Sequence, residues 1–419
     1  MKGSSKKLLA LWLLSGLLQL PVFAQKGLDA LYKSKQYFDL RDELAKHSRR
    51  KSAKLLFYRG VIANRFNQNA NAIKFLRQYI ASSDTDNLAE AYEELADSYT
   101  KTYQYRQAAE TYKILTERFK DRISPEKIAD HKNSYGLWNS LKDIAPQSTS
   151  ITRDLRLQAK RDKADLLNLP VTINGQKMDL VFDTGANLPV ITASTAKRLG
   201  LKIIESSVSV GSSTDSHVNS KLAVADVKIG DAVIKNAVFL VFDDRLLYFP
   251  QITYQINGII GFPIIESLGN FTVTQKNEFI VNLKPANSKA GQNLCLDGLL
   301  PLVAGFYHGR RMTFSLDSGA DRSMFYQSFF KADEQNIKKL AKPQKIKLGG
   351  AGGTQEVNGF IFDLDINIAN KKARFENASV ASEVSNENSK YLYGNLGQDL
   401  IKQFAKMTMN FKTMQIIFE

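Results

Sequence analysis

Apolar side chains between positions 25 and 145 recur at helical spacing, and the pattern repeats along the chain. One stretch fits a helix-turn-helix pair through Tyr92, Leu95, Ala96, Tyr99, Ala108, Tyr112 and Leu115. Most of this pattern occurs 36 positions earlier, at Leu56, Gly60, Ala63, Ala72, Leu76 and Tyr79. A weaker copy precedes it, at Leu28, Leu31, Leu40 and Leu44. The pattern predicts stacked pairs of helices in this part of the chain.

The helical pattern resembles tetratricopeptide repeats, whose period is about 34 residues. A stack of repeats needs a closing helix, and Pro125 is a suitable first residue for one. The apolar positions of that helix would be Ile128, Tyr135, Leu137 and Leu141. We therefore expect an all-α, repeat-like domain over residues 25–145. A plain helical bundle fits the same pattern.

The pattern changes to strands and turns in the rest of the chain. Residues 169–175 read as a strand followed by an Asn-Gly turn, and residues 302–309 occupy the equivalent place in a second β-rich unit. Both stretches are rich in apolar residues and have a length typical of strands. The sequence therefore predicts an all-β region made of two related units.

Two polar segments mark the boundaries of these units. The first, 146–165, opens with a Pro-Gln-Ser-Thr-Ser run that has no apolar periodicity. The second, 285–298, contains proline, asparagine and glycine. We interpret both segments as linkers. The β-rich units then cover residues 166–284 and 299–419.

Each β-rich unit contains the same short motif at the same place. Asp183-Thr184-Gly185-Ala186 and Asp317-Ser318-Gly319-Ala320 both follow an apolar run. An apolar triplet, Ile259-Ile260-Gly261, ends 78 positions after Asp183, and Asn395-Leu396-Gly397 ends 80 positions after Asp317. The tails after the two triplets align without a gap. The chain therefore contains two copies of one unit.

At these motifs the chain resembles the retropepsin-like aspartic proteases, in a single-chain, two-lobed arrangement like that of the pepsins. The resemblance covers about residues 168–419. It implies that each lobe donates one catalytic aspartate, Asp183 or Asp317, and that the apolar-apolar-Gly triplet crosses beneath each aspartate loop. Asn395 departs from the family pattern, which has an apolar residue there. The implied fold is an all-β, bilobal aspartic-protease domain that follows the helical repeats.

The chemistry gives an independent reason for two aspartates. Hydrolysis of a peptide without a metal needs a base that activates water and an acid that protonates the carbonyl oxygen. Two adjacent carboxylates supply both, because like charges so close together cannot both ionise and the pair keeps one proton. We expect Gly185 and Gly319 to let the backbone turn tightly behind each carboxylate. The family uses hydroxyls such as those of Thr184 and Ser318 to brace the opposite loops.

Ala186 and Ala320 occupy the fourth position of each motif, where pepsin-type loops commonly have Ser or Thr. A hydroxyl there would donate to the carboxylate and lower its pKa. Because alanine lacks that donor, we expect the shared proton to persist to higher pH than in pepsin. Asp-Thr-Gly and Asp-Ser-Gly are also ordinary turn sequences, so each motif alone has a second interpretation.

Each unit is expected to carry a hairpin that folds over a bound peptide. The resemblance places these flaps some 30 positions after the aspartates, where the candidate residues are Gly211, Ser212, Gly349, Gly350, Gly352 and Gly353. Glycine allows close backbone approach and the bending needed for entry. A plain flexible turn explains the first of these runs equally well.

The first residues fit a targeting segment. Lys2, Lys6 and Lys7 precede an apolar run, and small residues follow it at the expected cleavage position after Ala24. We therefore expect residues 1–24 to be a signal peptide and the protein to be exported, either periplasmic or extracellular. An uncleaved anchor is the alternative, although the apolar run is short for a membrane span. After cleavage no transmembrane span is expected.

Charge and the positions of cysteine and histidine argue against a nucleic-acid-binding protein, a disulfide-bonded protein and a metalloprotein. The formal net charge is +15, but basic residues are interleaved with acidic ones, which argues against a nucleic-acid partner. An acidic partner or an anionic envelope surface stays open. Cys295 is the single cysteine, so we expect no internal disulfide and a buried, small apolar role. The four histidines show no metal-ligand spacing, so neither a metal nor a cofactor is predicted.

Together these features predict an exported aspartic endopeptidase. A water activated between Asp183 and Asp317 would attack the peptide carbonyl, and the helical repeats would recruit a protein partner or substrate. Because one chain contains both aspartates, the protease part should be active as a monomer. The competing hypothesis is a catalytically inactive, protease-like module that binds peptides and is joined to an interaction scaffold.

Overall fold

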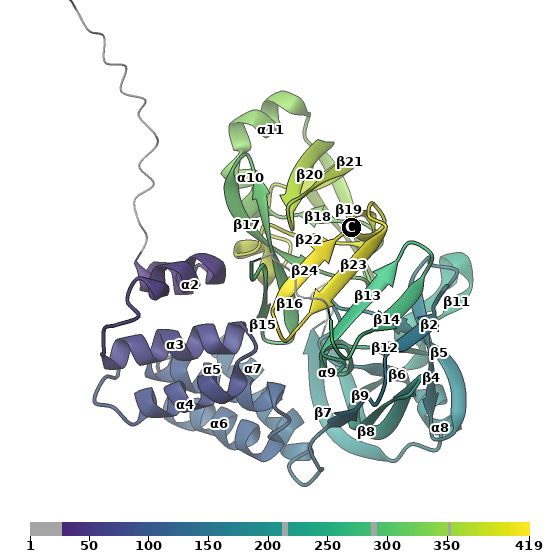
Figure 1. The fold of residues 1–419 in the computed structure, drawn as a ribbon, viewed down its shortest axis with the longest axis horizontal. Helices are drawn as coiled ribbons and strands as arrows, with labels where there is room; N and C mark the ends of the chain where they lie inside the picture. The colour runs from purple at the N-terminus through teal and green to yellow at the C-terminus, as the bar shows by residue number, and fades with distance from the viewer. Residues whose placement is uncertain (1–26, 212–216, 286–290, 351–352) are drawn as a thin grey trace, which may run out of the picture.

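The computed structural model describes residues 27–211, 217–285, 291–350 and 353–419. The segment predicted to be a signal peptide, 1–24, lies outside the described residues. Helices come first and β-sheets follow, so the predicted order of an all-α region and a β-rich region is confirmed (Figure 1). In the described part of the chain, no helix has both the length and the apolar character needed to span a membrane.

Helices fill residues 28–140. They are α1 (Leu28–Lys33), α2 (Tyr37–Ala45), α3 (Ala53–Arg65), α4 (Asn69–Ile80), α5 (Leu88–Lys101), α6 (Tyr105–Arg118) and α7 (Pro125–Ser140). The last of these begins at the predicted Pro125, and the hydroxyl of Ser124 caps it by accepting the Lys127 N–H at 3.3 Å.

Helices α3 and α4 pack closely at Gly60. A Cβ at this position would lie 2.6 Å from Leu76 Cγ, so only glycine lets the two helices approach this far. Leu76, Ala72 and Tyr79 on α4 are fully buried. The apolar pattern that predicts the helices therefore also identifies their buried face.

In the described residues, the β-rich region contains three large sheets and one two-stranded ribbon. The first runs in the order β1 (Ser148–Ser150), β9 (Ala232–Phe242), β6 (Val190–Thr192), β12 (Gly258–Ile260), β5 (Gln176–Phe182), β4 (Leu167–Ile173), β8 (His217–Ile229) and β7 (Ile203–Gly211), with β3 (Lys160–Arg161) paired to β4. The second runs in the order β15 (Leu294–Asp297), β16 (Leu300–Tyr307), β17 (Arg310–Leu316), β22 (Gly394–Leu396), β18 (Met324–Phe325), β21 (Lys371–Ala381), β20 (Gly353–Ile368) and β19 (Gln344–Gly350).

The third sheet joins the two β-rich units. Its order is β2 (Leu155–Gln158), β14 (Glu278–Val281), β13 (Asn270–Thr274), β23 (Lys406–Asn410) and β24 (Gln415–Phe418). Strand β13 from the first unit pairs antiparallel with β23 from the second, from Asn270 opposite Asn410 to Thr274 opposite Lys406. In Figure 1 this sheet lies between the other two. It fixes the two units relative to each other through backbone hydrogen bonds.

Short helices and a small ribbon complete the β-rich region. They are α8 (Ala193–Arg198), α9 (Phe262–Ser267), α10 (Gln327–Ala332), α11 (Glu334–Leu340), α12 (Gln398–Ile401), and the pair β10 (Tyr248–Phe249) and β11 (Tyr254–Gln255). Helix α9 directly follows β12, and α12 directly follows β22. The two units therefore repeat the same strand-to-helix step after each triplet.

The segments predicted as linkers take part in the sheets. Strand β1 pairs with β9, β2 with β14 and β3 with β4, and all three lie within 146–165. Strand β1 lies at the edge of its sheet and is held by backbone hydrogen bonds. Residues 148–150 include no apolar side chain, so their sequence shows no apolar pattern that would predict a strand. Strand β15 likewise lies inside 285–298 and contains the buried Cys295. That cysteine has the small, buried role expected of it.

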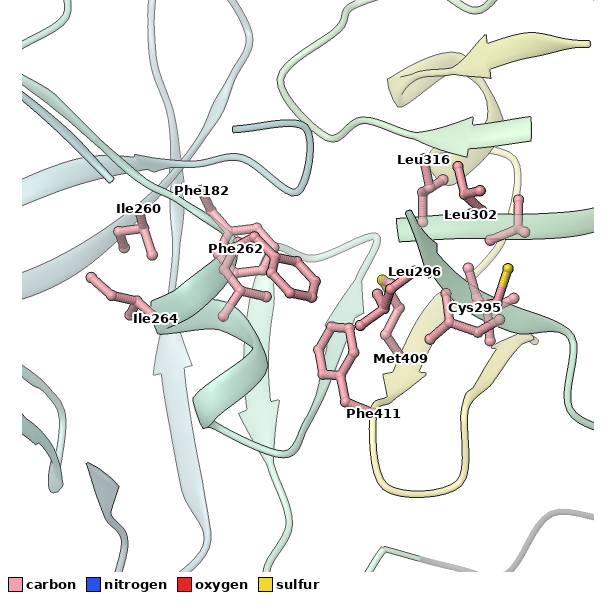
Figure 2. Packing of buried hydrophobic residues seen from close by; sticks show 14 of the residues in the cluster. Phe182, Ile260, Phe262, Ile264, Cys295, Leu296, Leu302, Leu316, Met409 and Phe411 are labelled. Carbon is pink, nitrogen blue, oxygen red and sulfur yellow. The ribbon is translucent and has the colours of Figure 1, made fainter. Parts of the chain in front are cut away.

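Aromatic side chains fill the space beneath the first unit and reach into the second. Phe182 packs against Phe271 and Phe279, with ring centroids 4.9 and 5.2 Å apart. Phe411, which follows β23 in the second unit, lies 5.6 Å from Phe262. Figure 2 shows Phe182, Phe262 and Phe411 within this core. The strand that ends at Asp183 is therefore anchored in a core that both units share.

A buried ionic cluster attaches the helices to the second unit. Arg65 on α3 contacts Glu94 at 2.6 Å, Asp97 at 3.3 Å and Asp297, at the end of β15, at 3.4 Å. Lys35 also reaches Asp297, at 2.8 Å. Burial alone would raise the pKa of Asp297, but the charges of Lys35 and Arg65 hold that pKa well below its usual range. The carboxylate therefore stays charged at this contact.

Replacing Arg65 by Met should lower the free energy of unfolding by about 3–5 kcal/mol, because the variant leaves the buried carboxylate of Glu94 without the cation that contacts it. Urea unfolding followed by fluorescence measures the change. Lys33→Met is the matched control, since Lys33 is exposed and pairs with Asp29 at 3.7 Å. It should change stability by less than about 1 kcal/mol. Equal effects of the two substitutions would contradict the cluster's structural role.

Candidate active site

Asp183 and Asp317 occupy equivalent positions at the ends of β5 and β17. The Asp183 N–H donates to the Ile260 carbonyl at 3.1 Å, and the Asp317 N–H donates to the Leu396 carbonyl at 2.9 Å. Strand β12 runs parallel to β5 and β22 runs parallel to β17. Each predicted triplet, 259–261 or 395–397, therefore lies beside its aspartate and fixes the backbone at that point.

The glycine that ends each triplet allows a close backbone crossing. A Cβ on Gly261 would lie 2.4 Å from the carbonyl carbon of Leu188, and one on Gly397 would lie 2.7 Å from the Ala320 oxygen. Such distances are too short for any side chain. The requirement for glycine in the triplets is therefore steric.

The two aspartate loops are braced against each other by reciprocal hydrogen bonds. The hydroxyl of Thr184 donates to the Leu316 carbonyl at 2.8 Å, and that of Ser318 donates to the Phe182 carbonyl at 2.9 Å. Each hydroxyl also accepts the backbone N–H of the other residue at 3.0 Å. Thr184 and Ser318 are both buried. This bracing sets the distance and orientation of the two loops.

The two carboxyl groups lie against the glycines of the opposite loops. A Cβ on Gly185 would lie 2.5 Å from Asp317 Cγ, and one on Gly319 would lie 2.4 Å from Asp183 Oδ2. Neither glycine has a positive φ. The sequence interpretation, a tight turn that requires glycine, is therefore incomplete. Glycine is needed here because the carboxylate of the other loop takes the space of a side chain.

Burial and charge disfavour ionisation of Asp183. Burial, followed by the neighbouring charge of Asp317, raises the pKa of Asp183 well above its usual range. The backbone N–H groups of Gly185 and Ala186 oppose this rise, and the Gly185 N–H donates to Asp183 Oδ1 at 2.7 Å. Gly319 makes the equivalent bond to Asp317 Oδ1 at 2.9 Å. Burial and the neighbouring carboxylate therefore favour retention of a proton on Asp183.

The structure supplies a donor that the sequence interpretation missed. Ala186 and Ala320 cannot donate through their side chains, as expected, but Asn395 takes over this role for one carboxylate. Its Nδ2 donates to Asp317 Oδ2 at 2.9 Å. The sequence interpretation considered a donor only at the fourth position of each motif and did not anticipate this bond to Asp317. The signal was present in the sequence, since a polar residue interrupts an otherwise apolar triplet.

Hairpins occur at both positions predicted for flaps. Strands β7 and β8 pair up to Gly211 opposite His217, and β19 and β20 pair up to Gly350 opposite Gly353. Gly349 lies in the same second hairpin, within β19. Two of the predicted flap residues, Ser212 and Gly352, lie outside the described residues. Whether either hairpin covers a bound peptide stays a prediction.

The first hairpin is attached to the helical region. Asn133 on α7 accepts the Ser209 N–H at 2.7 Å through its Oδ1. Its Nδ2 donates to the Ser209 carbonyl. The amide side chain thus satisfies both backbone groups of one residue in β7, as a neighbouring strand would. The position of β7 therefore depends on α7.

Side chains that commonly bind metals are dispersed. Over the residues that the structure describes, no group of three or more His, Cys, Asp or Glu residues could hold a metal ion. His131, for example, contacts Glu93 at 3.0 Å on the helical region. Burial raises the pKa of the Cys295 thiol.

The raised pKa of Asp183 has a consequence for stability. The folded chain holds a proton that the unfolded chain releases above the ordinary value of 3.8. Because the folded state binds more protons, the free energy of unfolding should fall as pH rises above about 4, until folded Asp183 itself ionises. Asp183→Asn removes this dependence on pH. The difference in unfolding free energy between variant and parent should therefore favour the variant more at pH 7 than at pH 4.

Urea unfolding at the two pH values measures this difference. Asp179→Asn is the control, because Asp179 lies on the same strand β5 but is exposed. Its effect should be similar at both pH values. If Asp183→Asn changes stability equally at pH 4 and pH 7, the carboxyl does not hold its proton in the folded state.

Comparison with known proteins supports the interpretation of the first unit. A family model described as aspartyl protease matches residues 169–264. This segment contains the Asp183 motif and the triplet 259–261, but it ends before Asp317. A search of curated proteins found no match. Over residues 169–264 the chain is therefore similar to aspartyl proteases.

Proposed function

We propose that this chain is an exported aspartic endopeptidase whose catalytic pair is Asp183 and Asp317. The observation that carries the proposal is the reciprocal bracing of the two loops, which holds two partly exposed carboxyl groups over each other's glycines. The match of residues 169–264 to an aspartyl protease model supports the same reaction class. Two carboxylates that share one proton are suited to direct attack by water.

The proposed architecture is bilobal, with the catalytic pair between the lobes. The first lobe would contain the sheet of β5 and β12, and the second would contain the sheet of β17 and β22. Both sheets place a parallel pair of strands beneath the aspartate and a further antiparallel strand beside it. The sheet formed by β13 and β23 would join the lobes. This repetition supports a single chain that needs no second copy.

In the first step, a water between the carboxyl groups attacks the peptide carbonyl carbon. The ionised carboxylate accepts a proton from the water, and the protonated carboxyl donates its proton to the carbonyl oxygen. A bond forms between the water oxygen and the carbon, which gives a neutral diol. The proton has then moved from one aspartate to the other, and the total charge of the pair is unchanged.

In the second step, the diol breaks down to products. The protonated aspartate donates its proton to the peptide nitrogen, and the C–N bond breaks. The other aspartate takes a proton from one diol hydroxyl, which leaves a carboxylic acid and an amine. The pair returns to its starting protonation state. The bracing by Thr184 and Ser318 keeps the carboxyl groups in position through both steps.

The hairpins and helices would bind the substrate. An extended peptide could form backbone hydrogen bonds with the edges of β7–β8 and β19–β20. We propose that the helices form tetratricopeptide-like repeats and recruit a partner or a large substrate. The bond from Asn133 to Ser209 supports a link between recruitment and the first hairpin. We also propose that residues 1–24 direct export to the periplasm or beyond.

Asp183→Asn and Asp317→Asn should each lower peptide cleavage by about 100- to 10,000-fold, because either change removes the acid or the base. Incubation with a complex peptide library, followed by mass spectrometry, detects cleavage without knowledge of the natural substrate. Asp179→Asn serves as the control and should cleave at the parental rate. It removes an exposed carboxylate from the same strand.

Two results would overturn this function. One is cleavage that continues in both dyad variants, which would place the reaction elsewhere. The other is a folded parent chain that binds peptides from the library without cutting any. If Asp183→Asn bound the same peptides equally well, the chain would be a peptide-binding module.

A further inference from the structure

The two halves of the candidate site differ at one matched pair of positions. In the first unit, Ile259 of β12 lies opposite Val181 of β5. In the second unit, Asn395 of β22 lies opposite Ser315 of β17. An apolar pair beside one aspartate is thus replaced by a polar pair beside the other. The bracing bonds and the glycine N–H bonds of the two loops are nearly symmetric, so this difference beside the aspartates needs an explanation.

Ser315 and Asn395 form a chain of hydrogen bonds that ends at Asp317. The Ser315 hydroxyl lies 2.6 Å from Asn395 Oδ1, and Asn395 Nδ2 lies 2.9 Å from Asp317 Oδ2. The same hydroxyl lies 3.3 Å from the Gly394 carbonyl. Because the serine is a donor to the amide oxygen, the amide nitrogen is turned toward the carboxylate. Ser315 is buried, which fixes this orientation.

We propose that Asn395, oriented by Ser315, is a positioning residue that makes Asp317 the charged member of the pair. Asp183 then carries the shared proton. The consequence for catalysis rests on the proposed function: Asp317 would accept the proton from water, and Asp183 would protonate the carbonyl oxygen. The inference about charge depends on the hydrogen bonds alone.

The physical reason is the unequal supply of donors. Donors favour the charged form of a carboxylate. Gly185 and Gly319 each donate one backbone N–H to their aspartate. The Ala186 N–H also lowers the pKa of Asp183, and Ala320 occupies the equivalent place beside Asp317, so the backbone effects of the two loops largely cancel. Asn395 adds a side-chain donor to Asp317, whereas the equivalent Ile259 has none. Over the described ranges, the donors recorded for the Asp183 carboxyl are backbone N–H groups.

Neighbouring ionisable groups agree with this assignment. In the described structure, the groups recorded as interacting with Asp317 are Asp183 and Tyr326. Burial raises the pKa of Tyr326 to about 12, so this side chain stays neutral while the pair titrates. Burial and the charge of Asp317 raise the pKa of Asp183. Among the described residues, no other charged group recorded beside the pair opposes the assignment, which rests on the hydrogen bond from Asn395.

Substitution of Asn395 tests the proposal in the full-length chain. In the parent, the acid limb of the kcat/KM profile reports ionisation of the base. Asn395→Leu removes the donor at similar size and should move this limb to higher pH by about one unit. Asn395→Gln keeps an amide and should restore part of the shift. Ile259→Leu, at the equivalent position of the first unit, should leave the acid limb in place.

A second readout does not require activity. The carboxyl carbons of Asp183 and Asp317 can be followed by ¹³C NMR during a pH titration, with Asp183→Asn and Asp317→Asn used to assign the signals. We expect Asp317 to ionise first, and its ionisation to move to higher pH in Asn395→Leu. First ionisation at Asp183 would overturn the proposal. So would an unchanged titration in a folded Asn395→Leu variant.

Failure of this inference can be distinguished from failure of the proposed function. If no peptide is cleaved but Asp317 ionises first and responds to Asn395→Leu, the inference stands and the protease function fails. If peptides are cleaved but the titration is insensitive to Asn395, the inference alone fails. Should Asn395→Leu not fold, Ser315→Ala tests the same point, because it frees the amide from its fixed orientation. Its acid limb should move in the same direction by a smaller amount, and no movement would overturn the proposal.

Discussion

The reciprocal hydrogen bonding of Thr184 and Ser318 is the interaction on which the site depends. Two carboxyl groups held side by side destabilise each other, because each resists ionisation of its neighbour. The loops that bear them are held together by bonds between hydroxyls and backbone groups, which do not change with pH. The opposite glycines leave room for the carboxyl groups. Without the bracing, repulsion would separate the carboxylates and the shared proton would be lost.

The shared sheet, the aromatic core and the helical region hold the two aspartate loops in this position. Strand β13 pairs with β23, so the two units share one sheet, and the aromatic core around Phe182 and Phe411 fills the space next to it. The helices are attached at several points, among them the cluster around Arg65 and the bond between Asn133 and Ser209. The helical region therefore contributes to the geometry of the β-rich region in addition to any role in recruitment.

Much of this organisation could be predicted from local sequence. The helical region follows from apolar spacing, and the aspartate motifs follow from their repetition with the later triplets. Other features depend on contacts between distant residues. Strand β1 has no apolar pattern because its pairing uses the backbone, and the contact of Arg65 with Asp297 joins elements that no local pattern relates. Asn395 was interpreted as a departure from an apolar position, since only the fold shows that its amide reaches Asp317.

The central claim is that one chain contains a complete site made from both of its aspartates. The most direct measurement mixes the Asp183→Asn and Asp317→Asn variants and compares peptide cleavage with that of each variant alone and of the parent. If each molecule uses its own pair, the mixture stays as inactive as its components, and parental activity per chain is independent of dilution. If the aspartates paired across two chains, mixing would restore activity. Restored cleavage would therefore contradict the account.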